Sequence, residues 1–360
     1  MIFLRAEISN AEIAKWRVLY LFQEKGSMEK AVERINGSVI IPTHNRAPIL
    51  QRVLVYYTLQ SADRRNFEVV VIDDGSVDET PSIFAGFKIE KDLPEKKLAR
   101  YLDRIIEVRS GWYSASVDEG LFIGHESFFI RYVRIKKSGR SIARNVGIYM
   151  AVFPLIIFAD DDIFVEGEFV EKHLNNHSYD DRLVVMGKVI HTQDLENPFV
   201  ARWKLKDINT AFLSTGNASV LKKYIIEAGM FDEKYSAYGW EDFDLGIHLK
   251  EMGIRSVKRD IFGYHYSPPE YELNPGAIYS KEKERGFTAV YFYINHSLKW
   301  VKRFTLVNNQ LLKALFNILG MNNWFLSRKR IRYLKGIVRL IIRYKGYFDG
   351  IDEGKKYFKL

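Results

Sequence analysis

The stretch LIIFADDDIFVEG, residues 155–167, contains the pattern that decides the fold. An apolar run ends abruptly in three carboxylates, Asp160, Asp161 and Asp162, and apolar residues resume at Ile163. A short, fully apolar run of this kind predicts a strand that is buried on both faces, as in a parallel sheet. Because ligands of open parallel sheets bind beyond the carboxyl ends of the strands, we expect the three negative charges to lie at a binding edge.

The same design occurs earlier in the chain. FEVVVIDDGSVDET (67–80) reads as a second apolar strand that ends in Asp73 and Asp74. Before it, SVIIPTHNRAPIL (38–50) predicts a strand that stops at Pro42 and is followed by a helix. Strand, helix and strand in this order predict an α/β fold with a mostly parallel sheet flanked by helices.

The chain is predicted to have three regions: an N-terminal helical extension at 1–36, an α/β domain at 37–279 and a basic, amphipathic helical region at 280–360. From Ser297 onward there are 15 Lys and Arg against 3 Asp and Glu, a charge of +12, so the rest of the chain carries −3 of the total +9. Within the α/β domain, GRSIARNVGIYMAV (139–152) predicts a helix that is entered through Ser141.

Composition suggests where the protein works. The sequence has no cysteine, which suits a reducing compartment, and it shows neither a secretory signal nor a run of apolar residues long enough to span a membrane. We therefore expect a cytoplasmic location. The basic tail favours a peripheral position on an anionic inner membrane face, with packing against its own domain as the alternative; nucleic-acid binding is disfavoured because the body is acidic.

The aspartate triplet predicts a divalent metal site. In an extended segment alternate residues point the same way, so Asp160 and Asp162 share a side. Paired carboxylates suit Mg²⁺ or Mn²⁺, which keep further positions for water and for the phosphates of a substrate. The alternative is that the aspartates cap the next helix or form a turn.

Five motifs in order resemble those of a family 2 glycosyltransferase with the GT-A fold, and the resemblance covers roughly residues 37–268. The motifs are SVIIPTHNRAPIL, VVVIDDGSVDET, GRSIARNVGI, FADDD and GWEDFDLGIHLKEMG. The segment from GNASV through GWEDFDLGIHL also resembles the acceptor side of β-galactosyltransferases and chondroitin-type polymerases. The resemblance implies transfer of a sugar, with inversion, from a nucleoside-diphosphate sugar to a hydroxyl of a glycan or a lipid-linked acceptor.

The resemblance also implies which residues bind the nucleotide sugar, with UDP favoured over other nucleotides. Residues that match the nucleotide, phosphate and sugar segments are Pro42, Thr43, Asn45, Arg46, Asp73, Asp74, Ser76, Arg140, Arg144, Asn145, Asp160, Asp161, Gly216 and Asn217. Asp73 and Asp74 match carboxylates that recognise uracil, although Asp74 also fits an ordinary turn. Arg144 fits equally well as a structural partner for an aspartate at the sheet edge.

The resemblance implies Asp162 as the direct metal ligand, Asp160 on the ribose or metal side, and His265, in GYHYSPP, as a third ligand. Which aspartates of the triplet bind the metal stays open. An imidazole beside two carboxylates suits Mn²⁺ better than Mg²⁺. A single histidine in an aromatic strand is otherwise more often a core residue, so this alternative stays open.

The catalytic base implied by the resemblance is Asp242, which would take the proton of the acceptor hydroxyl. Glu241 would hold the acceptor, and Trp240 would stack on a sugar face. Acidic residues at a helix start are also favoured by the helix dipole alone. A sugar-nucleotidyltransferase is a weaker alternative, because the first loop lacks a Gly-rich segment with Arg and Lys. The remaining alternative is a catalytically inactive sugar- or membrane-binding module.

Overall fold

The computed structural model describes residues 35–90, 98–114, 127–235, 237–269, 274–321 and 335–360. The predicted N-terminal helical extension lies almost entirely outside these residues. The described strands form one sheet. In sheet order they are β3 (Lys88–Ile89), β4 (Ile105–Tyr113), β5 (Phe128–Ile135), β2 (Phe67–Asp74), β1 (Gly37–Thr43), β6 (Leu155–Ala159), β9 (Asn217–Leu221), β8 (Leu183–Thr192), β10 (Arg255–Tyr266) and β7 (Ile163–Val165).

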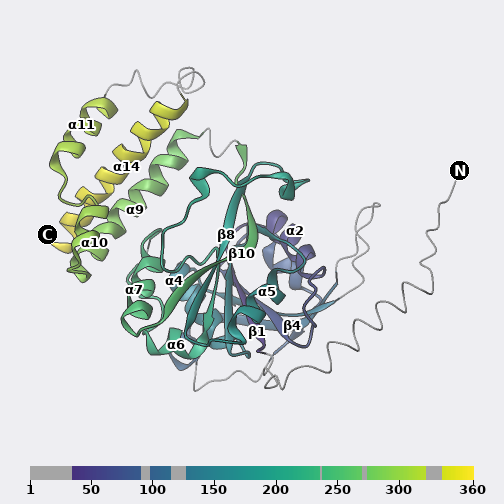
Figure 1. The fold of residues 1–360 in the computed structure, drawn as a ribbon. Coiled ribbons are helices and arrows are strands. Elements are labelled where there is room, and N and C mark those ends of the chain that lie inside the picture. Colours follow the sequence, from purple (N-terminus) through teal and green to yellow (C-terminus); the bar gives the residue numbers. More distant parts are fainter. Residues whose placement is uncertain (1–34, 91–97, 115–126, 236, 270–273, 322–334) are drawn as a thin grey trace, which may run out of the picture. The chain divides into compact units, whose positions relative to one another are not determined.

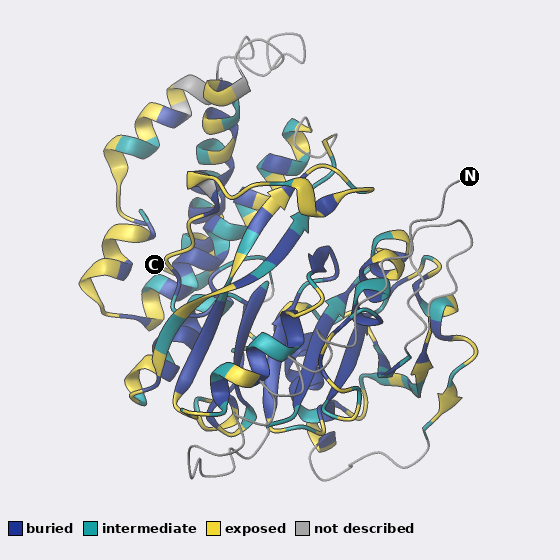
Figure 2. Cartoon of the chain, turned by 45° about the vertical axis from the view of Figure 1, so that its right-hand side comes forward, coloured by how far each residue is buried: buried dark blue, intermediate teal, exposed yellow. Residues whose placement is uncertain are grey.

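The sheet is mostly parallel, as the sequence predicts. Of the strands in the described ranges, β4, β9 and β7 run against their neighbours and the other seven share one direction. Every residue of β2 and β6 is buried, which explains why both strands are apolar throughout until their acidic ends. Figure 2 shows the central strands buried along most of their length.

Helices flank the sheet and form a separate bundle beyond it (Figure 1). Those nearest the sheet are α2 (Ala47–Tyr57), α4 (Arg140–Met150), α5 (Phe169–His177), α6 (Lys222–Glu227) and α7 (Glu241–Glu251). Short 3₁₀ turns are η1 (Thr80–Phe84), η2 (Ala99–Tyr101), η3 (Pro198–Val200) and η4 (Leu205–Asp207). The C-terminal bundle contains α9 (Pro275–Asn295), α10 (Lys299–Phe304), α11 (Gln310–Met321) and α14 (Lys335–Phe358).

The bundle packs on α7 through its own apolar core. Trp240 and Ile247, at and within α7, share this core with Val290 and Phe292 of α9 and with Phe348 of α14. The rings of Trp240 and Phe292 stack with centroids 5.1 Å apart. The expected boundary between 279 and 280 falls inside α9, so the helical region begins with that helix.

Two local expectations were wrong. Pro42 does not stop β1, which continues to Thr43. The ladder between β1 and β6 ends at Ile40, so by Pro42 the strand has one neighbour and tolerates proline as an edge strand does. Helix α4 is preceded by Gly139, whose φ of 96° favours glycine, and Ser141 lies inside the helix.

In the ranges that the structure describes, no helix is both long enough and apolar enough to cross a bilayer.

Candidate active site

A cavity of about 680 Å³ opens at the carboxyl ends of the parallel strands. Most of the residues predicted from the sequence line it. They are Pro42, Thr43, Arg46, Asp74, Arg140, Arg144, Asp160, Asp161, Asp162, Gly216, Glu241, Asp242 and His265. The sheet topology therefore gathers residues from segments more than 200 positions apart into one concave site.

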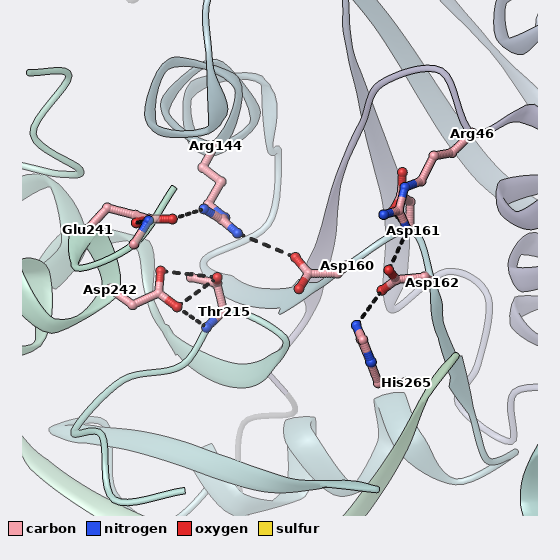
Figure 3. A network of polar contacts seen from close by, with 10 residues as sticks. Arg46, Arg144, Asp160, Asp161, Asp162, Thr215, Glu241, Asp242 and His265 are labelled. Atoms are coloured by element: carbon pink, nitrogen blue, oxygen red, sulfur yellow. Dashed lines mark hydrogen bonds and ion pairs between the residues drawn. The ribbon is translucent and has the colours of Figure 1, made fainter. Parts of the chain in front are cut away.

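Asp162 and His265 face each other because of strand pairing. Strand β7 follows the aspartate triplet and pairs antiparallel with β10, which sets His265 opposite Ile163. The Oδ1 atom of Asp162 is buried without a hydrogen-bond partner, and Nε2 of His265 faces it across 3.4 Å. Nδ1 of His265 lies 3.2 Å from Ser267 Oγ, a contact that orients the ring. Figure 3 shows this pair on one side of the site.

The three aspartates differ in their partners. Asp161 is buried and accepts a hydrogen bond of 2.7 Å from Thr43 Oγ1, while the guanidinium of Arg46 binds Asp162 Oδ2. Burial and the charge of Asp162 raise the pKa of Asp161 to about 7. Burial also opposes ionisation of Asp162, but His265 and Arg46 outweigh it and lower the pKa of Asp162 to about 2. The ionised member of this adjacent pair is therefore Asp162.

Asp160 turns to the other side of the site, where Arg144 links it to α7. The guanidinium of Arg144 lies 3.4 Å from Asp160 Oδ1 and 3.3 Å from Glu241 Oε1. Burial disfavours this charge, yet the surrounding carboxylates raise the pKa of Arg144. The second oxygen of Glu241 accepts from the backbone N–H of Gly239 at 3.0 Å. Arg144 thus forms ion pairs with both the sheet edge and the start of α7.

Asp242 is held by Thr215. Its Oδ2 accepts from the Thr215 backbone N–H at 2.9 Å, and the Thr215 hydroxyl lies 3.0 and 3.1 Å from its two oxygens. Burial raises the pKa of Asp242 to about 6, although the positive charge of Arg144 acts to lower it. A carboxylate fixed at a cavity wall and poised near neutral pH suits a general base.

The residues present fit a divalent metal ion at Asp162 and His265. Asp162 Oδ1 is buried, ionised and without a hydrogen-bond partner, and it lies 3.4 Å from Nε2 of His265. Two atoms at this separation can both bind one ion, since metal–ligand distances are about 2.0–2.2 Å. Among the described residues, the donor atoms of Asp160, Asp162 and His265 do not all come within 4.8 Å of one another. Asp160 faces Arg144 instead, so two of the three predicted ligands are placed together.

Six of the predicted residues do not line the cavity. Asp73 is fully buried and accepts hydrogen bonds from Ser76 N and Tyr132 Oη, so it braces its own loop. Asn45 receives a hydrogen bond from Val77 N and donates its own N–H to Ser76 Oγ, which joins the first and second loops. These contacts fix the first and second loops relative to each other.

The other three residues outside the cavity are buried in the protein. Asn145 bonds to Phe231, and Asn217 lies within hydrogen-bond distance of His173 at 3.0 Å. Trp240 stacks on Phe292 and donates its Nε1–H to the carbonyl of Arg285 at 2.9 Å. The expectation that Trp240 stacks on a sugar was wrong, because the apolar core shared by α7 and the C-terminal bundle takes its ring.

The sequence did not reveal several cavity residues, among them Lys137, Tyr238 and Lys281. Lys281 belongs to α9, and its Nζ lies 4.7 Å from the centre of the Tyr238 ring. The guanidinium of Arg140 lies 4.8 Å from the same ring. The only sequence signal for Lys281 is its positive charge. That signal does not single it out, because the region 280–360 contains many other Lys and Arg residues.

Comparison with known proteins identifies the family. The sequence model of glycosyl transferase family 2 matches residues 38–108 and 116–230. The chain belongs to glycosyl transferase family 2. It is thus a glycosyltransferase with an α/β architecture, and the alternative of a sugar-nucleotidyltransferase falls away.

Two curated relatives, a glycosyltransferase and a polysaccharide synthase, match about two thirds of this chain. An uncharacterized glycosyltransferase, YfnE of Bacillus subtilis (strain 168), is 25% identical over 65% of this chain and 66% of its own length. The hyaluronan synthase of Pasteurella multocida is 25% identical over 67% of this chain but only 25% of its own length. A solved structure of S. aureus TarS, residues 1–349, covers 90% of this chain and 92% of that one at 16% identity and a TM-score of 0.43. The chain therefore spans less than two thirds of the length of both curated relatives, 66% of YfnE and 25% of the hyaluronan synthase.

Proposed function

We propose that this glycosyltransferase transfers a sugar, with inversion, from a nucleoside-diphosphate sugar to a hydroxyl of a glycan or lipid-linked acceptor, with Mn²⁺ or Mg²⁺ as cofactor. The observation that carries the proposal is Asp242, a buried carboxylate with a raised pKa that is fixed by Thr215 at the cavity wall. The acceptor oxygen attacks the anomeric carbon, the bond from that carbon to the phosphate oxygen breaks, and the acceptor proton passes to Asp242. The electron pair leaves with the diphosphate.

The leaving diphosphate needs positive charge, and the cavity supplies it. A divalent ion held by Asp162 and His265 would add Lewis-acid stabilisation of the phosphate oxygens when bound. Lys281 and Arg140 lie over the same Tyr238 ring at the cavity wall, where burial lowers the pKa of Lys281 and the charge of Arg140 lowers it further. A phosphate group between or beside these two cations would relieve their repulsion. Both residues are therefore proposed to bind the donor diphosphate.

Glu241 takes a positioning role in this proposal. Because its oxygens are engaged by Arg144 and by the Gly239 N–H, it holds Arg144 rather than the acceptor. Gly216 lies against Asp160, since a Cβ on Gly216 would stand 3.5 Å from Asp160 Oδ2. A donor sugar can approach the backbone closely there.

UDP is the proposed nucleotide, on the strength of the sequence resemblance. Of the two aspartates expected to read uracil, Asp74 lines the cavity. Its carboxylate accepts from the N–H groups of Ser138 and Gly139 and from Lys137. We propose that Asp74 also accepts from the base, and a panel of nucleotide sugars in a thermal-shift assay with Mn²⁺ tests the choice of UDP. Equal stabilisation by GDP-, dTDP- and UDP-sugars would refute it.

A peripheral position on an anionic cytoplasmic membrane face is the proposed location. On α11, Leu311, Leu315 and Ile318 follow helical spacing and are 87%, 51% and 69% exposed. Basic residues Lys302 and Arg303 end the neighbouring helix α10. Exposed apolar side chains and positive charge in one helical bundle favour the interface of an anionic bilayer.

Replacing Asp242 by Asn tests the assigned base. The amide keeps the size of the side chain but cannot accept the proton, so release of nucleoside diphosphate from the donor should fall by about 10²-fold or more. Donor binding, followed by thermal shift with Mn²⁺, should persist. Glu251→Gln, an acid-to-amide change at the exposed end of the same helix, should keep wild-type turnover. Wild-type turnover of Asp242→Asn would overturn the assignment.

A further inference from the structure

A second group of metal-ligand side chains lies outside the cavity, where α7 meets the end of α9. It consists of Asp244, His248 and His296, with one ligand atom of each within 4.8 Å of those of the other two. None of them lines the active-site cavity. The group is therefore separate from Asp162 and His265.

Helix geometry brings the three residues together. Asp244 and His248 stand four residues apart on α7, so their side chains lie one above the other on one face. His296 directly follows the last residue of α9, and its Nε2 lies 2.7 Å from Asp244 Oδ1. Two ligands come from one helix and the third from another.

The surroundings resemble those of a structural metal site. The side chains of Asp244 and His296 are 3% and 8% exposed. Tyr235 donates its hydroxyl proton to Asp244 Oδ1 at 3.1 Å, an outer contact of the kind that orients metal-binding carboxylates. The Phe292 ring packs 4.7 Å from the His296 ring, centre to centre, and His248 is only partly buried, which leaves a route from solvent.

A buried ion pair would explain Asp244 and His296 but not His248. Among the described residues, the imidazole of His248 makes no hydrogen bond, and its one ring neighbour is His296 at 5.9 Å. Two nitrogen donors and one oxygen donor therefore lie within 4.8 Å of one another. Zn²⁺ accepts this set of ligands readily.

We propose that Asp244, His248 and His296 form a zinc site that joins the C-terminal bundle to α7. Nε2 of His296 would bind the ion in its unprotonated form, and the ion would take the place of the hydrogen bond between His296 and Asp244. Because α7 begins with Glu241 and Asp242, the ion fixes the bundle to the helix that carries the proposed base. The inference stands on the geometry of this cluster and does not depend on the proposed sugar transfer.

Zinc binding by the full-length protein tests the proposal. The protein is stripped with a chelator, titrated with Zn²⁺, and followed by elemental analysis and the midpoint of thermal unfolding. Zinc should raise the midpoint in wild type, and His248→Ala and His296→Ala should weaken zinc affinity by about tenfold or more. His265→Ala should keep the zinc-induced rise, because His265 lies in the cavity.

His248 decides the outcome if His296→Ala does not fold, since a partly exposed side chain can be removed at lower cost than a buried one. Wild-type zinc affinity in His248→Ala would overturn the site. Loss of all zinc binding in His265→Ala would also overturn it, because the ion would then belong to the active site. Neither result would bear on Asp242, whose role is measured by turnover.

Discussion

Three adjacent aspartates show how far neighbours with the same side chain can differ. Asp160 faces Arg144, Asp161 accepts from Thr43, and Asp162 faces His265 and Arg46. Burial and the charge of Asp162 keep a proton on Asp161 near neutral pH, while Arg46 and His265 keep Asp162 ionised. Asp162 is therefore the ionised member of the adjacent pair formed by Asp161 and Asp162.

The pKa of Asp242, about 6, predicts the pH dependence of turnover. A base must be unprotonated to accept the acceptor proton, so activity is complete above this pKa and is lost as the pH falls through it. Below about pH 6, kcat should drop by about tenfold per pH unit. Turnover measured from about pH 8 to about pH 5 checks this, with Glu251→Gln expected to give the wild-type profile. A flat profile across this range would exclude Asp242 as the base.

At the scale of elements, α9 and α14 meet through glycines. Gly346, Gly350 and Gly354 recur every fourth residue of α14, and a Cβ on each would lie within 3 Å of a backbone oxygen of α9. Those oxygens belong to Tyr279, Lys283 and Phe287, also four residues apart. The two helices therefore run parallel at close range, and an ion pair of 2.6 Å between Lys283 and Glu353 flanks the contact.

Gly350→Ala should destabilise the bundle, because the added Cβ would stand 1.9 Å from the Lys283 oxygen and force the helices apart. We expect the free energy of unfolding to fall by roughly 1–3 kcal/mol, the usual range for overpacking. Denaturant unfolding followed by circular dichroism measures it. Gly336→Ala, on the same helix with no atom within 4 Å of its Cβ, should leave stability unchanged or slightly higher. Equal stability of the two variants would contradict the close packing of α9 and α14.

At the scale of the whole molecule, the C-terminal bundle contributes to the active-site cavity and packs against α7. Lys281 extends from α9 to the cavity, and Trp240 at the start of α7 inserts into the core of the bundle. The proposed donor site and the proposed base thus both depend on where the bundle packs.

Lys281→Met should raise the KM for the donor, because it removes a charged partner of the diphosphate and keeps the length of the side chain. Hydrogen bonds to charged groups contribute about 1.5–3 kcal/mol, which corresponds to roughly a 10- to 150-fold change. Initial rates against donor concentration measure the effect. Lys283→Met, two residues along α9 and paired with Glu353, should keep the wild-type KM. An unchanged KM in Lys281→Met would remove Lys281 from the donor site.

Membrane binding is tested by flotation of the full-length protein with vesicles that contain phosphatidylserine. A chain cut near Tyr279 is unsuitable because the cut falls within α9. The double variant Leu311→Glu with Ile318→Glu should float far less than wild type, since it places negative charge on the exposed face of α11. Ile226→Glu, at an exposed apolar position of α6, should float as wild type does. Equal flotation of all three proteins would end the membrane proposal.

The sequence by itself determined the α/β class, the apolar strands and the acidic residues at their ends. It could do so because hydrophobic periodicity and strand-end charge are local properties, readable without knowing what packs where. The order of five motifs likewise pointed to the glycosyltransferase family that the family comparison then identified.

Only the tertiary structure decided which residues meet. Trp240 and Asp73 carry motif positions, yet long-range packing places the Trp240 ring in an aromatic core and buries Asp73 against Tyr132. Lys281 reaches the cavity, and His296 reaches α7, because α9 packs where it does. The contacts of Trp240 with Phe292, of Asp73 with Tyr132 and of His296 with Asp244 join residues 52 to 59 positions apart along the chain. They arise from burial of apolar surface shared between elements, which no local pattern of the sequence records.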